Sequence, residues 1–99
     1  MIVITRYTVP AEQVEDFRAR AAEALRVLGA RPGFVGSRVG RAADDPELWT
    51  VVTEWEGAGH YRRALSDFEV RMAAVPLLSQ ARDEPTAYEI VNVPTPGGG

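Results

Sequence analysis

One apolar segment constrains the fold of this chain more than any other. Residues 48–55 read LWTVVTEW, and β-branched and aromatic residues of this kind favour an extended strand. The two-residue period of a strand places Trp49 and Trp55 on one face and Val52 on the other, so both faces are largely apolar. A strand of this kind is covered on both sides. The segment therefore predicts a central strand with helices on one face and a second cover on the other.

The periodicity of the remaining chain predicts an α+β fold. Alternating residues indicate strands, and apolar residues at three- and four-residue steps indicate helices. In chain order we expect a strand, a helix, two strands, a helix and a strand, at residues 2–8, 10–29, 34–41, 48–55, 60–75 and 87–93. This β-α-β-β-α-β order is ferredoxin-like, with a four-stranded antiparallel sheet and both helices on one face. We expect one domain over residues 1–93 and a flexible tail at 94–99.

The second predicted helix contains a break. Ser66 followed by Glu69 is a capping-box pattern, so the helix should break near Ser66, restart, and stop at Pro76. Its apolar stripe is expected to face the sheet and consists of Tyr61, Leu65, Phe68 and Met72.

Composition excludes several classes of function. The chain has 99 residues and a net charge of −3, which creates no field that attracts nucleic acid or an anionic membrane. It has no cysteine and one histidine, so we expect no transition-metal site. It contains no apolar run of the ~20 residues that a membrane span needs, and no signal-peptide pattern. We therefore expect a cytoplasmic protein.

The predicted sheet leaves one apolar face without helices. An open apolar face of this size is unusual on a monomer. The simplest cover is a second copy of the chain, with two sheets packed face to face in a barrel-like homodimer. Small-molecule sites tend to lie where such layers meet. On the first strand, Arg6 and Tyr7 point to opposite faces, and an Arg6 on the dimer side is expected to pair with a carboxylate such as Glu54.

Several short motifs resemble the antibiotic biosynthesis monooxygenase family over residues 1–93. They are Arg-Pro-Gly-Phe at 31–34, the strand ending in Glu-Trp-Glu at 54–56, the aromatic residue at 61 and the Ser-Asp-Phe restart at 66–68. The resemblance implies a dimeric α/β barrel. In the branch that oxidises polyketide anthrones to quinones without a cofactor, it implies a pocket with a Trp, a Tyr and an Arg. Trp55 and Tyr61 occupy the first two places, and Arg71 occupies the third if a gap is allowed.

The haem-degrading branch of the family matches this sequence less well. Its helical Trp and its axial His fall near Ala64 and Ala74, and His60 lies on the other side of the helix break. The Asn that the anthrone-oxidising branch has four residues before its Trp is Val51 in this chain. The resemblance therefore implies a haem-free protein that lacks this amide.

The predicted site has six members. The catalytic candidates are His60, Tyr61 and Arg71, and the substrate-binding candidates are Trp55, Tyr7 and Val51. Each role has a structural alternative. Trp55 and Tyr61 also suit a hydrophobic core, and Arg71 also suits a solvated surface. His60 is either an exposed residue at a helix start or a general base that titrates near neutral pH.

Two functions agree with this sequence. One is a cofactor-independent monooxygenase that oxidises a small aromatic quinol, phenol or anthrone-like substrate with O₂, after deprotonation by His60 or a tyrosine. The alternative is a dimeric barrel without catalysis, which binds an aromatic metabolite or acts as a scaffold. Whether the chain is an enzyme stays open between these two.

Overall fold

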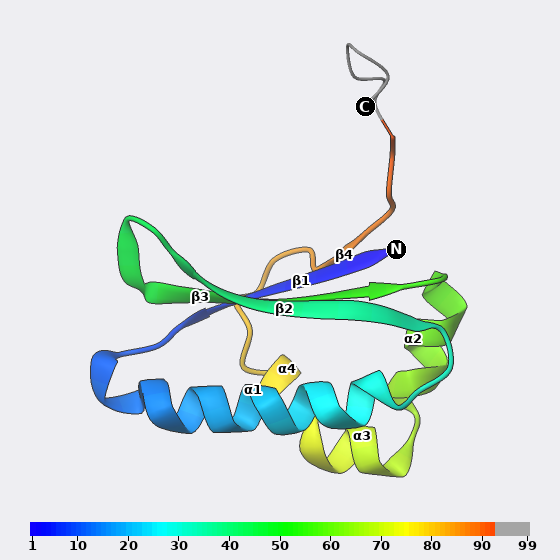
Figure 1. Ribbon diagram of the computed structural model, residues 1–99, viewed down its shortest axis with the longest axis horizontal. Helices are drawn as coiled ribbons and strands as arrows, with labels where there is room; N and C mark the ends of the chain where they lie inside the picture. The colour runs from blue at the N-terminus through cyan, green and yellow to red at the C-terminus, as the bar shows by residue number, and fades with distance from the viewer. Residues whose placement is uncertain (93–99) are drawn as a thin grey trace.

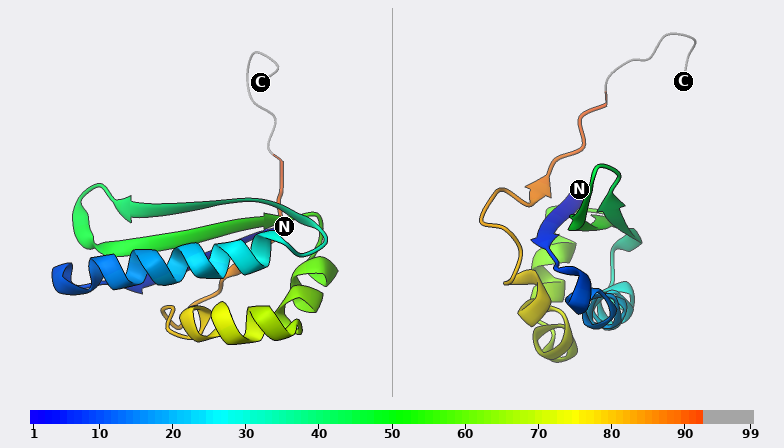
Figure 2. Two further views of the ribbon diagram at one scale, coloured as in Figure 1. Left: turned by 60° about the horizontal axis from the view of Figure 1, so that its bottom comes forward. Right: turned by 90° about the vertical axis from the view of Figure 1, so that its left-hand side faces the viewer.

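The computed structural model describes residues 1–92 as a four-stranded antiparallel sheet with helices on one face (Figures 1 and 2). The strand order is β2-β3-β1-β4, so β3 lies between β2 and β1 as predicted for the Trp-bearing strand. The ferredoxin-like α+β fold is confirmed. In chain order the elements are β1 (Ile2–Thr8), the 3₁₀ helix η1 (Ala11–Gln13), α1 (Val14–Gly29), β2 (Phe34–Ala42), β3 (Asp45–Trp55), α2 (Ala58–Leu65), α3 (Phe68–Ala73), α4 (Val75–Leu78) and β4 (Ala87–Tyr88).

The last strand is shorter than the predicted 87–93. Tyr88 pairs with Ile2, the first residue of β1, so a longer β4 has no strand left to pair with. Beyond Tyr88 the chain leaves the sheet (Figure 1). The preceding segment instead runs along β1 through separate hydrogen bonds, from Arg82 N to Arg6 O and from Ile4 N to Thr86 O, at 2.8 and 2.7 Å. Residue 93 and the predicted tail at 94–99 lie outside the described residues.

The hydrophobic core fills the layer between the sheet and the helices. Alternate residues of β1 and β3 point into it, and α1 supplies the opposite wall. Ala21 and Ala24 of α1 are 1% exposed, and these small side chains allow the helix to approach the sheet closely. Aromatic pairs lie at both ends of the layer: the Phe17 ring is 5.1 Å from Tyr7, and the Phe34 ring is 5.3 Å from Trp55.

The second helical region breaks where the sequence predicts, but a different residue caps the restart. The α2 helix ends at Leu65, and α3 begins at Phe68. Ser66 keeps a helical conformation as the C-cap of α2, so Asp67 becomes the N-cap of α3. The Asp67 carboxylate accepts a hydrogen bond from Val70 N at 3.3 Å and lies 3.2 Å from Arg31 Nη1. The break is therefore tied to the turn that precedes β2.

This break also makes part of the predicted apolar stripe wrong. Phe68 and Met72 are 76% and 65% exposed, whereas Val70 and Ala74 are fully buried. The predicted stripe kept one helical spacing across the break, but Ser66 and Asp67 turn the chain there and change which face of α3 meets the core. Pro76 does not end the helical region, because it lies in the first turn of α4, where its missing N–H is tolerated.

Gly33 joins the turn before β2 to the start of α2. It has a φ of +86°, and a Cβ at this position would lie 2.2 Å from His60 Cγ. Its carbonyl oxygen accepts a hydrogen bond from Glu56 N at 2.8 Å. The backbone conformation and the contact with His60 both require glycine.

We predict that Gly33→Ala lowers the free energy of unfolding by about 2 kcal/mol or more. The new Cβ clashes with His60, and alanine is strained in the left-handed backbone conformation that Gly33 adopts. Urea denaturation measures this loss. Gly59→Ala is the control, since its Cβ meets only the flexible end of Arg63, at 3.4 Å. In a helix this change leaves stability the same or raises it by about 0.5–1 kcal/mol. An equal loss in both variants would contradict the role of Gly33.

Candidate functional site

Four of the six predicted site residues gather between the sheet and the helices. The strand register places Tyr7 of β1 and both Val51 and Trp55 of β3 on the sheet face that the helices cover, and Tyr61 comes from α2. The Tyr61 ring lies 5.5 Å from the Trp55 ring. Trp55 is only 1% exposed, and Tyr61 is partly buried. Both side chains therefore pack in the core.

A small hollow of about 10 Å³ lies beside Tyr61 and Val51. Its walls are mainly aliphatic and include Leu25, Leu28 and Leu77. This volume corresponds to about one water molecule, whereas pockets for drug-sized ligands occupy about 300–1,000 Å³. At this volume the hollow has no room for an aromatic substrate.

Two buried threonines, which we did not predict, organise the polar groups of this interior. Tyr7 OH donates a hydrogen bond to Thr5 Oγ1 at 3.0 Å, and Thr5 Oγ1 donates to Val51 O at 3.2 Å. Trp55 Nε1 donates to Thr53 Oγ1 at 2.9 Å. Both threonines also line the hollow. The sequence signal for them is a threonine two residues from an aromatic residue, which puts both on the same face of a strand.

The two interior tyrosines are held in the protonated form. Burial raises the pKa of Tyr61, and proximity to Tyr7 raises it further. Burial also raises the pKa of Tyr7, against the opposing effects of its hydrogen bond with Thr5 and of Arg20. No hydrogen-bond partner of Tyr61 OH occurs among residues 1–92. Tyr61 therefore presents an uncommitted hydroxyl donor at the edge of the apolar core.

His60 and Arg71 lie outside this group. The His60 ring packs on Gly33, with Nε2 3.8 Å from Glu56 Oε2 and Nδ1 3.3 Å from Arg63 Nη2. Arg71 is exposed in the last turn of α3. Neither residue lines the hollow. The reason is helical geometry: consecutive residues point about 100° apart, so the neighbours of Tyr61 and of the buried Val70 face other directions.

A polar groove of about 190 Å³ lies on the other side of Tyr7. It runs between the end of β1 and the start of α1, and Gln13, Asp16, Arg20 and Gln80 line it. Arg20 Nη1 donates a hydrogen bond to Gln80 Oε1 at 3.0 Å. Since Tyr7 lines this groove and its hydroxyl binds Thr5, the Tyr7–Thr5 pair lies between the groove and the interior hollow.

Arg6 pairs with a different carboxylate from the one predicted. Its Nε and Nη2 atoms donate to Glu84 Oε1 and Oε2, each at 2.7 Å, so the expected pair with Glu54 is wrong. The hydrogen bonds from Arg6 lower the pKa of Glu84. Glu84 reaches Arg6 because residues 82–88 run beside β1. A fork-to-fork pair of this kind fixes the segment before β4 to the sheet.

Two kinds of feature do not occur in the part of the chain that the structure describes. Within residues 1–92 no three His, Cys, Asp or Glu side chains are grouped so that they can hold a metal ion. Over the same residues, no helix combines the length and the apolar character that crossing a membrane requires.

Solved structures share this fold. SnoaB, a cofactor-independent oxygenase from Streptomyces nogalater solved as a variant, is 21% identical with a TM-score of 0.75, over 95% of this chain and 96% of that one. A conserved protein from Methanosarcina mazei is 22% identical with a TM-score of 0.69, over 87% and 84%. A putative antibiotic biosynthesis monooxygenase from Chloroflexus aurantiacus is 19% identical with a TM-score of 0.66, over 99% and 97%. These likenesses establish a shared fold.

Family membership comes from the sequence match. A comparison with curated proteins found no match. The family model for antibiotic biosynthesis monooxygenase, however, matches residues 1–73, which include β1 to α3 and every predicted site residue. The chain therefore belongs to the antibiotic biosynthesis monooxygenase family.

Proposed function

We propose that this protein is a cofactor-independent monooxygenase that oxidises a small aromatic substrate with O₂ in the layer between the sheet and the helices. The observation that carries the proposal is the Tyr61 phenol, which is partly buried beside Trp55 and has no hydrogen-bond partner among residues 1–92. Family membership supports monooxygenase chemistry. The description of SnoaB as a cofactor-independent oxygenase supports chemistry without a cofactor.

The proposed reaction balances without a cofactor because the substrate supplies every electron. An anthrone-like substrate loses a proton to water as it binds and so gives an enolate, which transfers electrons to O₂. One oxygen atom enters the product as a new carbonyl in place of a CH₂ group. The other oxygen atom leaves as water, which takes up the two hydrogens of that CH₂ group. The protein therefore has to bind the substrate, stabilise the enolate oxygen and exclude bulk water.

The interior residues match these tasks. Tyr61 stays protonated because its pKa is raised, so it serves as a hydrogen-bond donor to the enolate oxygen and not as a base. Trp55 offers an aromatic face, and Thr53 fixes its ring through Nε1. Val51 keeps the wall apolar. His60 and Arg71 have no part in this arrangement, since their side chains point away from the hollow.

Substrate entry requires the interior to open. The hollow of about 10 Å³ is formed partly by Leu77 and Leu78 of α4 and by Tyr61 of α2. Movement of these short helices away from the sheet enlarges it, and the break at Ser66 and Asp67 provides a hinge between α2 and α3. The closed hollow also favours the second candidate function, a barrel without catalysis that binds an aromatic metabolite elsewhere or acts as a scaffold.

We predict that Tyr61→Phe lowers kcat/KM for a quinol or anthrone by about tenfold to a hundredfold, because one donor to the enolate oxygen is lost. Oxygen consumption measures turnover. The melting temperature should change by only a few degrees, since the ring and its contact with Trp55 remain. Tyr88→Phe is the matched control, because the Tyr88 hydroxyl donates to Pro85 O on the exposed edge of the sheet.

Equal turnover by wild type and Tyr61→Phe would remove Tyr61 from the mechanism. Tryptophan fluorescence quenched by quinols or anthrones, with no oxygen uptake, would establish the binding function in place of the monooxygenase.

We also propose that two copies pack through the sheet faces that the helices leave uncovered. Ile2, Ile4, Leu48 and Val52 are only partly buried on this face. Pairing two such faces removes their apolar surface from water.

We predict a homodimer at micromolar concentration, with twice the 10.8 kDa mass of one chain, in sedimentation equilibrium. The apolar area of the uncovered face is the reason, since stable interfaces commonly bury about 1,200–2,000 Å² in total. A folded monomer at this concentration would refute the dimer.

A further inference from the structure

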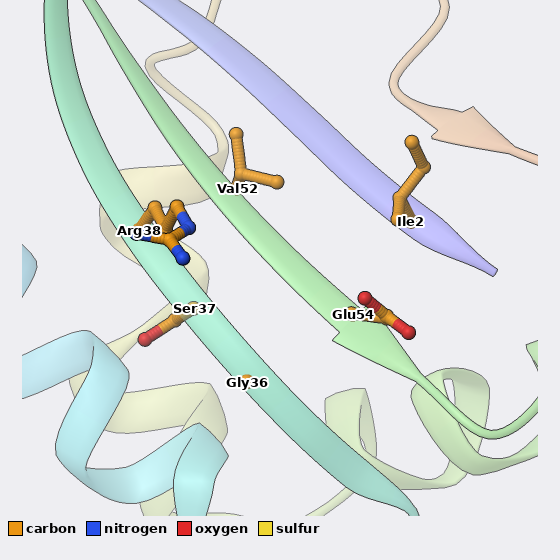
Figure 3. A pocket seen from close by; sticks show the side chains of 6 residues that line it. All are labelled: Ile2, Gly36, Ser37, Arg38, Val52 and Glu54. Carbon is orange, nitrogen blue, oxygen red and sulfur yellow. The ribbon is translucent and has the colours of Figure 1, made fainter. Parts of the chain in front are cut away.

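A shallow groove of about 220 Å³ lies on the sheet face opposite the helices (Figure 3). Ile2, Arg38, Val52 and Glu54 line it and stand on the same side of β1, β2 and β3. In the strand register Arg38 lies opposite Val52, and Gly36 lies opposite Glu54. Arg38 and Glu54 are therefore diagonal neighbours on adjacent strands, a position from which long side chains reach one another.

The two charged residues of this groove have no ion-pair partner among residues 1–92. Arg6 on the same face is already paired with Glu84, whereas Arg38 and Glu54 are exposed and form no salt bridge within the described chain. One positive and one negative charge are thus left between partly buried aliphatic side chains. The face has the charge balance that a self-complementary surface needs.

Gly36 leaves a stretch of β2 backbone without a side chain on this face. Glycine inside a strand reduces stability, and it is normally explained by a bulge, a positive φ or a close neighbour. Among the glycines of residues 1–92, Gly33 has the positive φ, and a Cβ built on Gly36 meets no atom within 4 Å. The register shift between Phe34 and Gly36 marks a bulge, where glycine is common, and the missing side chain also leaves room for another molecule to approach β2 closely.

A two-fold axis combines these observations. In an isologous interface every contact occurs twice, because residue i meets residue j and residue j meets residue i. Two copies can stack with these faces together and a two-fold axis between the sheets, midway between Arg38 and Glu54. Rotation about this axis places Arg38 of each protomer opposite Glu54 of the other. The backbone at Gly36, which is next to this pair, then faces the opposing sheet without a side chain in between.

We propose that Arg38 and Glu54 set the register of the dimer by pairing across the two-fold axis, Arg38 of one protomer with Glu54 of the other, while Gly36 lets the two sheets meet closely. This inference rests on the homodimer proposed above. It adds the residues that determine which arrangement of the two sheets forms.

Charge reversal tests the pairing. Arg38→Glu places two acidic residues opposite each other, and Glu54→Arg places two basic residues opposite each other. Each variant alone should have a dimer dissociation constant raised by about tenfold or more. A 1:1 mixture should form a heterodimer of near wild-type affinity, because both pairs then have opposite charges. Native mass spectrometry resolves the heterodimer, and sedimentation velocity measures the affinities.

Two further variants make the test specific. Arg18→Glu reverses an exposed charge on α1, away from this face, and should leave the dimer unchanged. Gly36→Phe should give a folded monomer, since its side chain enters open space within one protomer and blocks the partner.

Each other outcome overturns a defined part. If both charge variants dimerise as tightly as wild type, the pairing is wrong and the homodimer stands. If both are weakened and mixing restores nothing, the two residues do not meet across the axis. A monomeric wild type refutes the homodimer itself. A dimeric Gly36→Phe removes Gly36 from the interface.

Discussion

The burial of Trp55 at the end of β3 is the interaction on which the rest of the structure depends. Its ring contacts Phe34 from the start of β2 and Tyr61 from α2, and its backbone exchanges hydrogen bonds with Met1 at the start of β1. The starts of β1 and β2 and the helix α2 therefore all meet at this one residue of β3. Truncation of a buried residue of this size costs about 3–5 kcal/mol, a large part of the total stability of a small domain.

The same packing creates the chemical environment of the interior. Because the helices cover this sheet face, the hydroxyls of Thr5 and Thr53 are removed from water and bond to Tyr7 and Trp55. Burial also keeps Tyr61 protonated. Tyr61 is only partly buried, so its unpaired hydroxyl is left to water or to a ligand. Core packing and a substrate-facing role are thus compatible for Tyr61, although the two had been alternatives in the sequence.

The opposite sheet face has a different character because no helix covers it. On this face Arg6 reaches Glu84 because residues 82–86 hydrogen-bond along β1. Such a pairing depends on a contact between segments 78 residues apart, which local periodicity does not contain. The exposed positions of Phe68 and Met72 have a similar origin, since the two residues of the break set the direction of α3.

The sequence by itself determined the order of the elements, the central place of the Trp-bearing strand and the break near Ser66, because each is written in local periodicity and capping chemistry. It also placed Tyr7, Val51, Trp55 and Tyr61 in one group, through strand alternation and the family resemblance. Only the tertiary structure decided that His60 and Arg71 point elsewhere, that Thr5 and Thr53 complete the interior, and that β4 ends at Tyr88. These features depend on which surfaces meet. The spacing of residues along the chain does not specify which surfaces meet, whereas packing of the helices against the sheet does.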